Sequence, residues 1–387
     1  MPPKLLSALG ATSALVLDYW RAWRTLRRRP YLAPPPPPSP GVPLVSILIP
    51  ARNEERAIGS CVAAALAQDY PALEVLVVDD GSTDATPQIL AQMRHHPQLR
   101  ILSGRPLPPG WAGKPNVCQQ LGEAAHGEWL LFLDADTLPH PQLTAALLHH
   151  AQQQQLALVS ILPFLELGSF WERAILPAFQ DLIMQIYPIE RMQRPDAQPH
   201  EVLANGQCIL VCRAAYKQIG GHAAVRAEVL EDVYLAQAVR RAGFRVGGGD
   251  GHDYLRVRMY TNGPEVVEGM AKHAAAGARA GGGRAWLVVA RMLAHAFGPS
   301  LLVVAGRVIR NRGERTTGNT ISALGAVAQS AGWCYWGRRY RELYAHHPIH
   351  ALLWPLGLAA YLAIAVRAMW RVRRGHGVTW KGRRYAG

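Results

Sequence analysis

Short apolar runs alternate with longer amphipathic stretches across residues 44–155, and this alternation is the strongest constraint on the fold. The runs are rich in Val, Ile and Leu, whereas the stretches between them repeat apolar residues with helical spacing. Apolar strands joined by helices form a mainly parallel sheet covered on both faces, so an α/β domain is predicted. The predicted strands are 44–50, 73–80, 99–102 and 129–133, and the predicted helices are 56–68, 84–96, 114–126 and 141–155.

Acidic residues stand where two of these strands end. Asp79 and Asp80 close "LEVLVVDD", and Asp134 and Asp136 follow the apolar run "WLLFL". The carboxyl ends of parallel strands meet at one edge of a sheet, and ligands bind there. A third acidic site, Glu231-Asp232, opens a predicted helix, where the helix dipole alone also favours acids. Asp-Gly-Ser after Asp79 is equally good turn chemistry, so a purely structural role stays open there.

The Asp134-Ala-Asp136 pair is harder to explain as a turn. Two crowded carboxylates repel each other unless a cation or a proton intervenes. Mg²⁺ or Mn²⁺ prefers oxygen ligands and is commonly held by one or two carboxylates together with substrate phosphates. The pair therefore predicts a metal site and a phosphate-bearing substrate.

Two enzyme classes fit that chemistry. "LDADTL" resembles the motif of haloacid-dehalogenase-type phosphatases, in which Asp134 would be a nucleophile. That motif normally lies on the first core strand, whereas a complete βαβα unit precedes it here. The second class is glycosyl transfer from a nucleotide sugar, which we favour. An inactive membrane scaffold is the non-enzyme alternative.

Charge and hydropathy indicate a membrane. The chain of 387 residues carries a net charge of +14, with 49% hydrophobic and only 18% charged residues. Clusters of Lys and Arg flank apolar stretches, as juxtamembrane segments do, and no nucleic-acid-binding motif is present, so we expect a membrane partner and no nucleic acid. The five cysteines have no paired spacing, which fits a reducing compartment.

We predict four consecutive regions. Residues 1–32 form an apolar and basic N-terminal anchor, and 33–43 form a stiff proline-rich linker. Residues 44–268 form the catalytic domain, and 269–387 form a membrane-associated helical region with basic loops. Within the last region, 285–305 and 349–366 are apolar enough to span or embed, and 319–336 is a weaker candidate. The apolar stretch 167–188 is predicted to be a helix that either packs in a core or lies at the membrane surface.

The ordered motifs resemble glycosyltransferase family 2, whose members are inverting enzymes with the GT-A nucleotide-diphospho-sugar fold. The match runs from "VSILIPARNEE" and "VLVVDDGSTDAT" through "LLFLDADTLP" to "VLEDVYLAQAVRRAGFRV". "PPGWAGKPNVCQQ", "ANGQCILVCRAAYKQIGG" and the terminal "GVTWKGRRY" are similar to a membrane-bound branch that includes carotenoid and hopanoid-associated glycosyltransferases.

The resemblance implies a role for each matching residue. Asp232 is expected to be the general base, Asp136 the main metal ligand, and Asp134 a contact to the ribose or sugar of the donor. Residues expected at the nucleotide or its phosphates are Pro50, Arg52, Glu54, Asp79, Asp80 and Lys114. Residues expected near the sugar or acceptor are Asn205, Gly206, Gln207 and Glu231.

The implied reaction is metal-dependent transfer of one hexose from a nucleotide-diphosphate sugar, expected to be a UDP-hexose, to a hydroxyl of a lipid-soluble acceptor. A carotenoid or related polyisoprenoid is the favoured acceptor, with a hopanoid, a ceramide-like lipid or a glycolipid precursor as alternatives. The Gln-x-x-Arg-Trp motif of processive synthases does not occur, and "EGMAKHAAAG" occupies that region, which favours a single transfer. We expect the inner cell membrane as the location, with the catalytic domain facing the cytoplasm.

Overall fold

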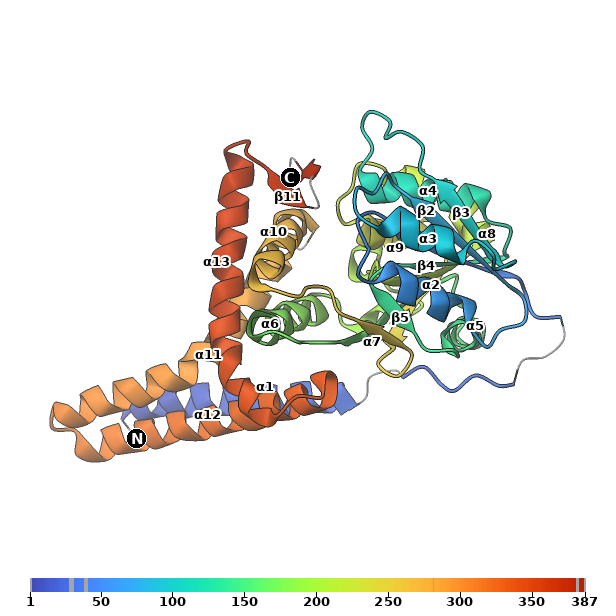
Figure 1. The fold of residues 1–387 in the computed structure, drawn as a ribbon. Coiled ribbons are helices and arrows are strands. Elements are labelled where there is room, and N and C mark those ends of the chain that lie inside the picture. The colour runs from blue at the N-terminus through green and yellow to red at the C-terminus, as the bar shows by residue number, and fades with distance from the viewer. Residues whose placement is uncertain (1, 28–30, 38–40, 281, 381–382, 386–387) are drawn as a thin grey trace. The chain divides into compact units, whose positions relative to one another are not determined.

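The computed structural model describes residues 2–27, 31–37, 41–280, 282–380 and 383–385, and it divides into two compact units (Figure 1). The catalytic unit comprises residues 30–166 and 187–259, and the helical unit comprises 1–29, 167–186 and 260–387. Each unit gathers segments that are separated in the sequence. Residues 167–186 therefore belong with the C-terminal helices, although they lie inside the range predicted for the catalytic domain.

The catalytic unit is built on a seven-stranded sheet with the order β3-β2-β1-β4-β8-β6-β9. Six of its strands run parallel to a neighbour, namely β3, β2, β1 and β4 in one half and the pair β6 and β9 in the other. Strand β8 runs antiparallel to both β4 and β6. The predicted mainly parallel α/β sheet is thus confirmed. The strands are β1 (Val45–Ala51), β2 (Leu73–Asp79), β3 (Leu99–Ser103), β4 (Trp129–Leu133), β6 (Leu158–Leu162), β8 (Cys208–Cys212) and β9 (Val246–Asp250).

Helices cover this sheet, and the apolar strands form the core between them. Ile47, Ile49, Val75 and Val77 are fully buried, as strands covered on both faces require. The helices are α2 (Ile58–Leu66), α3 (Thr86–Met93), α4 (Gly113–Ala124), α5 (Leu143–Gln153), α7 (Ile189–Met192), α8 (Arg213–Gln218) and α9 (Glu231–Arg241). Each predicted helix from 56 to 155 is present, and the observed ends lie within three residues of the predicted ones.

A second, three-stranded sheet has the order β5-β10-β7 and follows directly from β4. Its strands are β5 (Thr137–Pro139), β7 (Phe164–Leu165) and β10 (Leu255–Val257). β5 begins one residue after Asp136, so this small sheet fixes the direction in which the chain leaves the Asp134-Ala-Asp136 turn.

The helical unit contains α1 (Pro3–Arg27), α6 (Phe170–Ile186), α10 (Gly263–Ala280), α11 (Gly282–Asn311), α12 (Arg315–Tyr344) and α13 (Trp354–Arg373). Figure 1 shows α11 and α12 as a long hairpin with α1 alongside. Two segments among the described residues are long and apolar enough to cross a membrane, Ala285–Asn311 and Pro348–Arg373. They contain the predicted apolar stretches 285–305 and 349–366, whereas 319–336 lies in α12 and does not pass that test.

The predicted helix 167–188 corresponds to α6, and the aromatic side chains along it differ in environment. Phe179 packs beside the rings of His273 and Tyr361, at 5.3 and 5.6 Å between centroids. Trp171, in contrast, is 47% exposed. Parts of the predicted N-terminal anchor and linker (28–30 and 38–40), and residues 381–382 of the terminal motif, lie outside the described residues.

Candidate active site

Three adjacent parallel strands bring the predicted acidic sites to one edge of the sheet. β1 lies between β2 and β4, so Arg52, Asp80 and Asp134 follow neighbouring strand ends. The register pairs Ala51 with Asp79, which places the ends of β1 and β2 level with each other. The expectation that these residues share one edge of the sheet is therefore met by the topology.

The loops after β1 and β2 are tied together. Arg52 Nη1 donates a 2.5 Å hydrogen bond to the backbone oxygen of Asp80 and lies 3.7 Å from the Asp80 carboxylate. Asn53 adopts a left-handed conformation with φ of 53°, and its Oδ1 accepts a hydrogen bond from the Thr83 backbone N–H. The backbone N–H of Glu54 donates to Thr86 Oγ1 at 2.8 Å. These contacts bring Arg52, Glu54 and Asp80 into one loop cluster beside Pro50.

Asp79 and Asp80 have different environments. Asp79 Oδ1 accepts a hydrogen bond from the Ser82 backbone N–H at 3.1 Å, which closes the turn at Gly81, a residue with φ of 65°. Asp79 thus performs the turn-forming role that its sequence also suggested. Asp80 is the acid that faces Arg52.

Lys114 joins the second and third acidic sites. It stands in the first turn of α4, and its Nζ lies 2.6 Å from Asp134 Oδ1 and 3.1 Å from Glu231 Oε1. Burial works to lower the pKa of Lys114, but the Asp134 and Glu231 carboxylates outweigh burial and raise that pKa well above its usual value. Lys114 is therefore a fixed positive charge between the end of β4 and the start of α9.

Asp232 is held in the first turn of α9 by two backbone N–H groups. Gly206 donates to Asp232 Oδ2 at 2.7 Å, and Val233 donates to Asp232 Oδ1 at 2.8 Å. Burial and the neighbouring Glu231 carboxylate raise the pKa of Asp232 to about 6, against the opposing effect of Lys114 and the two N–H donors. A carboxylate with such a pKa can accept a proton near neutral pH.

The turn before β8 completes the site. Asn205 Nδ2 donates to Gln207 Oε1 at 3.0 Å, and the Gln207 backbone N–H donates to Asn205 Oδ1 at 3.2 Å. Gly206 lies so close to the charged groups that a Cβ atom there would come within 2.8 Å of Lys114 Nζ and 3.0 Å of Asp232 Oδ2. The structure thus brings Asn205, Gly206 and Gln207 together with the acidic sites.

The residues at this edge offer oxygen ligands to a cation. No group of three or more His, Cys, Asp and Glu that could hold a metal ion occurs among the described residues. Cys61 lies below the turn, and its Sγ donates to the Asp134 backbone oxygen at 3.6 Å, but burial raises the pKa of this thiol to about 12. The available donors are therefore the Asp134 and Asp136 carboxylates, a hard oxygen set that fits Mg²⁺ or Mn²⁺ with further ligands from a substrate.

Some supporting residues had no signal in the sequence. Ser160 in β6 accepts a hydrogen bond from the Asn205 backbone N–H at 2.7 Å and donates to the Cys208 backbone oxygen at 2.9 Å. His222 is buried, and its Nδ1 lies 2.8 Å from the Tyr216 hydroxyl. Burial lowers the pKa of His222 to about 3, so this imidazole is neutral at the working pH of the protein.

The chain is similar to known glycosyltransferases. Residues 46–220 match the family model "Glycosyl transferase family 2". The 4,4'-diaponeurosporenoate glycosyltransferase of Staphylococcus aureus strain MRSA252 is 25% identical over 347 residues, covering 88% of each chain. The enzyme of the same name from Staphylococcus haemolyticus is 28% identical over 239 residues, covering 60% of this chain and 62% of the relative.

A solved structure shows the same fold. The mannosyltransferase of Pyrobaculum calidifontis, solved with GDP-Man and Mn²⁺, superposes with a TM-score of 0.53 and 21% identity, covering 95% of this chain and 98% of that chain. The mainly parallel sheet, with acids at its edge, is thus that of the GT-A fold. Within that fold, residues 46–220 are similar to family 2 glycosyltransferases.

Proposed function

We propose that the protein is an inverting, metal-dependent transferase that moves a single hexose from a UDP-hexose to a hydroxyl of a carotenoid or related polyisoprenoid. The observation that carries this proposal is the meeting of Asp134 and Glu231 at the Lys114 ammonium, with Asp232 beside them. Asp134 stands at the edge of the sheet where ligands bind in folds of this kind, and Asp232 supplies a proton acceptor.

The donor would lie along the edge formed by β2, β1 and β4. Arg52 and Asp80, which contact each other, would bind the nucleoside, with Pro50, Glu54 and Asp79 lining the same loops. Lys114 would meet the diphosphate, since its ammonium is the cation nearest to Asp134 in this cluster. Asp134 would then contact the ribose or the sugar.

Asp136 would be the main protein ligand of a divalent cation, with Asp134 beside it. The support is the hard oxygen donor set and the protonated state of the nearby Cys61 thiol. When bound, Mg²⁺ or Mn²⁺ would neutralise the charge of the leaving nucleoside diphosphate.

Asp232 would accept the proton of the acceptor hydroxyl as the new bond forms at the anomeric carbon. A single in-line displacement inverts that carbon and needs only one carboxylate, because no covalent sugar intermediate is formed; a retaining enzyme would need a second carboxylate as nucleophile. Gly206 and Val233 hold the Asp232 carboxylate by their backbone N–H groups, so its orientation is set before the substrate arrives.

The acceptor class is supported by the two Staphylococcus relatives, whose name specifies a carotenoid. That name ends in "-oate" and so denotes a carboxylate, which carries no proton to remove. In this chain Asp232 is placed to accept a proton, which a carboxylate acceptor would not supply. A neutral hydroxyl fits this site better and makes use of Asp232.

We infer the location from the apolar helices of the helical unit and from the compartment that supplies the donor. Two candidate membrane helices indicate membrane association. We propose the inner cell membrane with the catalytic unit facing the cytoplasm, where nucleotide sugars are made.

The test uses the full-length protein in nanodiscs with UDP-hexoses or GDP-hexoses and two carotenoids that differ only in bearing a hydroxyl or a carboxyl group. We expect one hexose on the hydroxyl compound by mass spectrometry, opposite anomeric configuration from the donor by NMR, and loss of activity with EDTA that Mn²⁺ or Mg²⁺ restores. Transfer only to the carboxylate would overturn the assigned acceptor group.

Two variants separate the alternatives. Asp232→Asn should abolish transfer while the fold is kept, and Asp136→Ala should abolish the response to added metal. A phosphoenzyme at Asp134 would support the phosphatase alternative. An unchanged lipid profile in cells that carry only Asp136→Ala would support the inactive scaffold, and a hexose missing from a hopanoid or glycolipid in a deletion strain would redirect the acceptor to that lipid.

A further inference from the structure

The arm formed by α1, α11 and α12 exposes apolar side chains on the outer faces of all three helices. On α11, Leu301 and Val304 are 65% and 55% exposed. Their counterparts on the other two helices are Leu6, Leu9 and Leu17 on α1 and Val327 and Trp333 on α12. A docking patch for one partner would occupy one side, whereas this apolar surface is distributed around the arm.

Polar side chains in the arm are turned toward neighbouring helices. Ser300 Oγ of α11 donates to Gln329 Oε1 of α12 at 2.9 Å, and Ser322 Oγ of α12 donates to the Val303 backbone oxygen at 3.2 Å. Hydrogen bonds of this kind between helices are how polar residues are accommodated in a lipid environment. Ser322 and Gln329 of α12 are thus used in contacts inside the arm, whereas Asn319 and Thr320 are exposed toward its free end.

The charged residues at the base of the arm are paired across helices. Asp18 of α1 lies 3.2 Å from Arg291 Nε and 3.7 Å from His295 Nε2, both on α11. The Tyr19 hydroxyl donates to the His295 backbone oxygen at 3.1 Å. Asp18 and Arg291, which separately argue against a membrane segment, thus neutralise each other.

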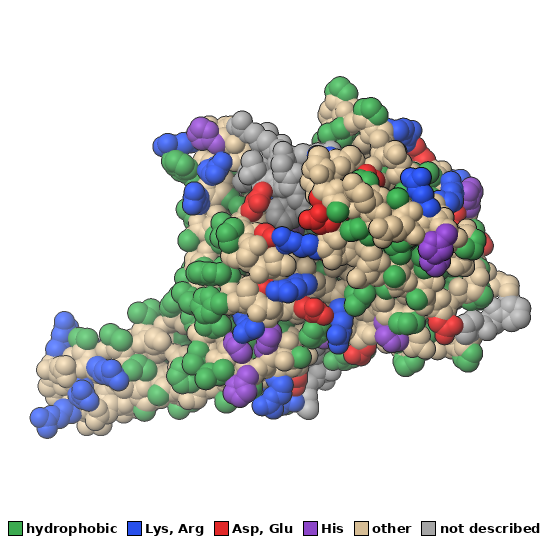
Figure 2. All heavy atoms as spheres, in the orientation of Figure 1, with side chains coloured by type: hydrophobic (Ala, Val, Ile, Leu, Met, Phe, Trp, Pro, Cys, Tyr) green, Lys and Arg blue, Asp and Glu red, His purple; other side chains and the backbone are tan. Residues whose placement is uncertain are grey.

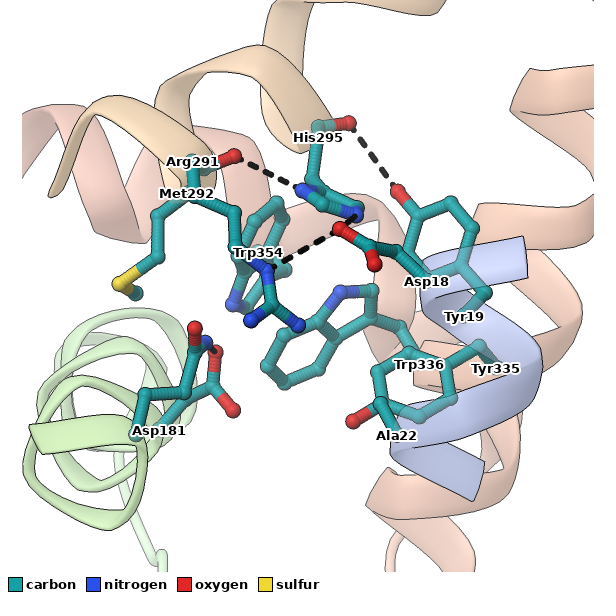
Figure 3. A pocket seen from close by; sticks show the side chains of 11 residues that line it. Asp18, Tyr19, Ala22, Asp181, Arg291, Met292, His295, Tyr335, Trp336 and Trp354 are labelled. Atoms are coloured by element: carbon teal, nitrogen blue, oxygen red, sulfur yellow. Dashed lines mark hydrogen bonds and ion pairs between the residues drawn. The ribbon is translucent and has the colours of Figure 1, made fainter. Parts of the chain in front are cut away.

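Figure 3 shows these groups around a small internal cavity at the base of the arm, where Asp18 points toward Arg291 and His295 and the indoles of Trp336 and Trp354 close one side. The cavity holds about 20 Å³, room for about one water molecule. The side chains of Asp18 and His295 are 31% and 10% exposed, whereas that of Arg291 remains 47% exposed at the base of the arm.

Small residues allow α11 and α12 to pack closely along their outer halves. A Cβ atom on Gly306 would come within 2.5 Å of the Gly318 backbone oxygen, and one on Gly325 within 2.8 Å of the Pro299 backbone oxygen. Close helix contact through glycine is the usual packing of membrane helices, because lipid gives no hydrophobic drive for association.

Basic residues bracket the apolar part of the arm. Residues 316–337 of α12 contain no Asp, Glu, Lys or Arg, and Arg315 and Arg338 stand at the two ends. These ends are separated by about 35 Å at about 1.5 Å per helical residue, which matches a hydrocarbon layer of about 30 Å. Figure 2 shows Lys and Arg side chains gathered at the free end of the arm. That end carries Lys4, Arg307, Arg310, Arg312 and Arg315.

Aromatic residues accompany the basic residues at the other end. The Arg24 guanidinium lies 4.7 Å from the Trp20 ring centroid, and Arg338 lies 5.5 Å from the Trp23 ring centroid. Trp beside Arg is the usual composition of a membrane–water interface.

We propose that α1, α11 and α12 together cross the lipid bilayer as one three-helix arm, with Arg315 and Arg338 near opposite interfaces. α1 and α12 are thereby membrane helices that depend on α11 to satisfy their polar groups. The bilayer is the occupant that fits an apolar surface on all sides with basic residues at both ends. This inference concerns the helical unit alone and does not depend on the proposed chemistry.

The arm carries its own reporter for this test. Cys334 is exposed on α12 between Arg315 and Arg338, while Cys61, Cys118 and Cys208 are buried. Full-length Cys212→Ser protein would be treated in bacterial spheroplasts with a charged, membrane-impermeant maleimide. Two further variants, Asn311→Cys and Arg341→Cys, would be made in a Cys212→Ser, Cys334→Ser background to report on the two ends of the arm.

We expect Asn311→Cys and Arg341→Cys to react from opposite sides of the membrane, one before and one only after permeabilisation. Cys334 should react only after SDS. Reaction of both end cysteines from the same side would overturn a spanning arm. Rapid labelling of Cys334 in intact membranes would also overturn the proposal. So would protection of Cys334 in lipid-free protein that light scattering shows to be a dimer. Resistance of each variant to carbonate extraction and a single peak in detergent exclude misfolding.

Discussion

The Lys114 ammonium lies 2.6 Å from the Asp134 carboxylate, although Lys114 stands in α4 and Asp134 in the turn after β4. The same ammonium contacts Glu231 at 3.1 Å, so one cation connects the Asp-Ala-Asp turn to the acid pair of α9. The turn after β4 and the acid pair of α9 are thus electrostatically coupled.

Removal of the Lys114 charge should impair both halves. Lys114→Met leaves Asp134 and Glu231 unneutralised, and the loss of a hydrogen bond to a charged group costs about 1.5–3 kcal/mol, or roughly 10- to 150-fold in kcat/KM for the donor. Lys114→Arg keeps the charge and should retain more activity than Lys114→Met. Steady-state kinetics with varied donor measure both; equal activity of the two variants would contradict the charge argument.

The raised pKa of Asp232 predicts the pH dependence of the reaction. Below a pH of about 6 the carboxyl group is protonated and cannot act as a base, so kcat/KM should rise with pH through about 6 and then level off. Lys114 lowers that pKa, so Lys114→Met should move the rise to higher pH. Asp232→Asn should reduce kcat about 10²- to 10⁴-fold and remove the rise. Rates measured from pH 5 to 8 check the profile. A flat profile in the unmodified protein would argue against Asp232 as a base that is protonated at low pH.

Much of the catalytic unit could be predicted from sequence, because buried strands and their terminal acids are local patterns. The "WLLFL" run ends at Asp134 in β4, and "LEVLVVD" ends at Asp79 in β2, as expected. β7, with only the residues Phe164–Leu165, is too short to show a periodicity of two. The pairing of Lys114 with Glu231 could not be predicted, because it depends on how α9 returns to the sheet edge.

The N-terminal segment shows the same limit in the helical unit. Asp18 interrupts the apolar run 5–17, which made that run look too short for more than a marginal anchor. Its partners Arg291 and His295 lie in a distant part of the sequence, so only the folded chain shows that the charge is compensated. The membership of α6 in the helical unit is likewise a long-range property.

Gly206 offers a test of how closely the charged groups must approach. Gly206→Ala places a Cβ atom 2.8 Å from Lys114 Nζ and 3.0 Å from Asp232 Oδ2, so the two side chains must move apart. We expect about a tenfold or greater loss of kcat with little change in melting temperature, since a 1 Å misplacement at a reacting group costs about 10²-fold. Gly59→Ala is the matched control, because its Cβ atom would meet only the flexible Ile89 side chain at 3.2 Å. Full activity in Gly206→Ala would show that Lys114 and Asp232 need not be adjacent.

The helical unit contains a buried ion pair, and removal of only one of its two charges should destabilise the fold. Arg339 Nη1 of α12 lies 2.7 Å from Asp181 Oδ1 of α6, and both side chains are at most 6% exposed. Arg339→Met leaves the Asp181 charge buried without its partner, which should lower the free energy of unfolding by about 3–5 kcal/mol. The double variant Asp181→Leu, Arg339→Met removes both charges and should recover most of that loss. The neighbouring Arg338→Gln removes the exposed pair with Glu342 and the contact with the Trp23 ring, and should cost about 1 kcal/mol. Thermal unfolding of the full-length protein in detergent ranks the three variants, and an Arg339→Met protein as stable as Arg338→Gln would show that the pair does not hold α6 against α12.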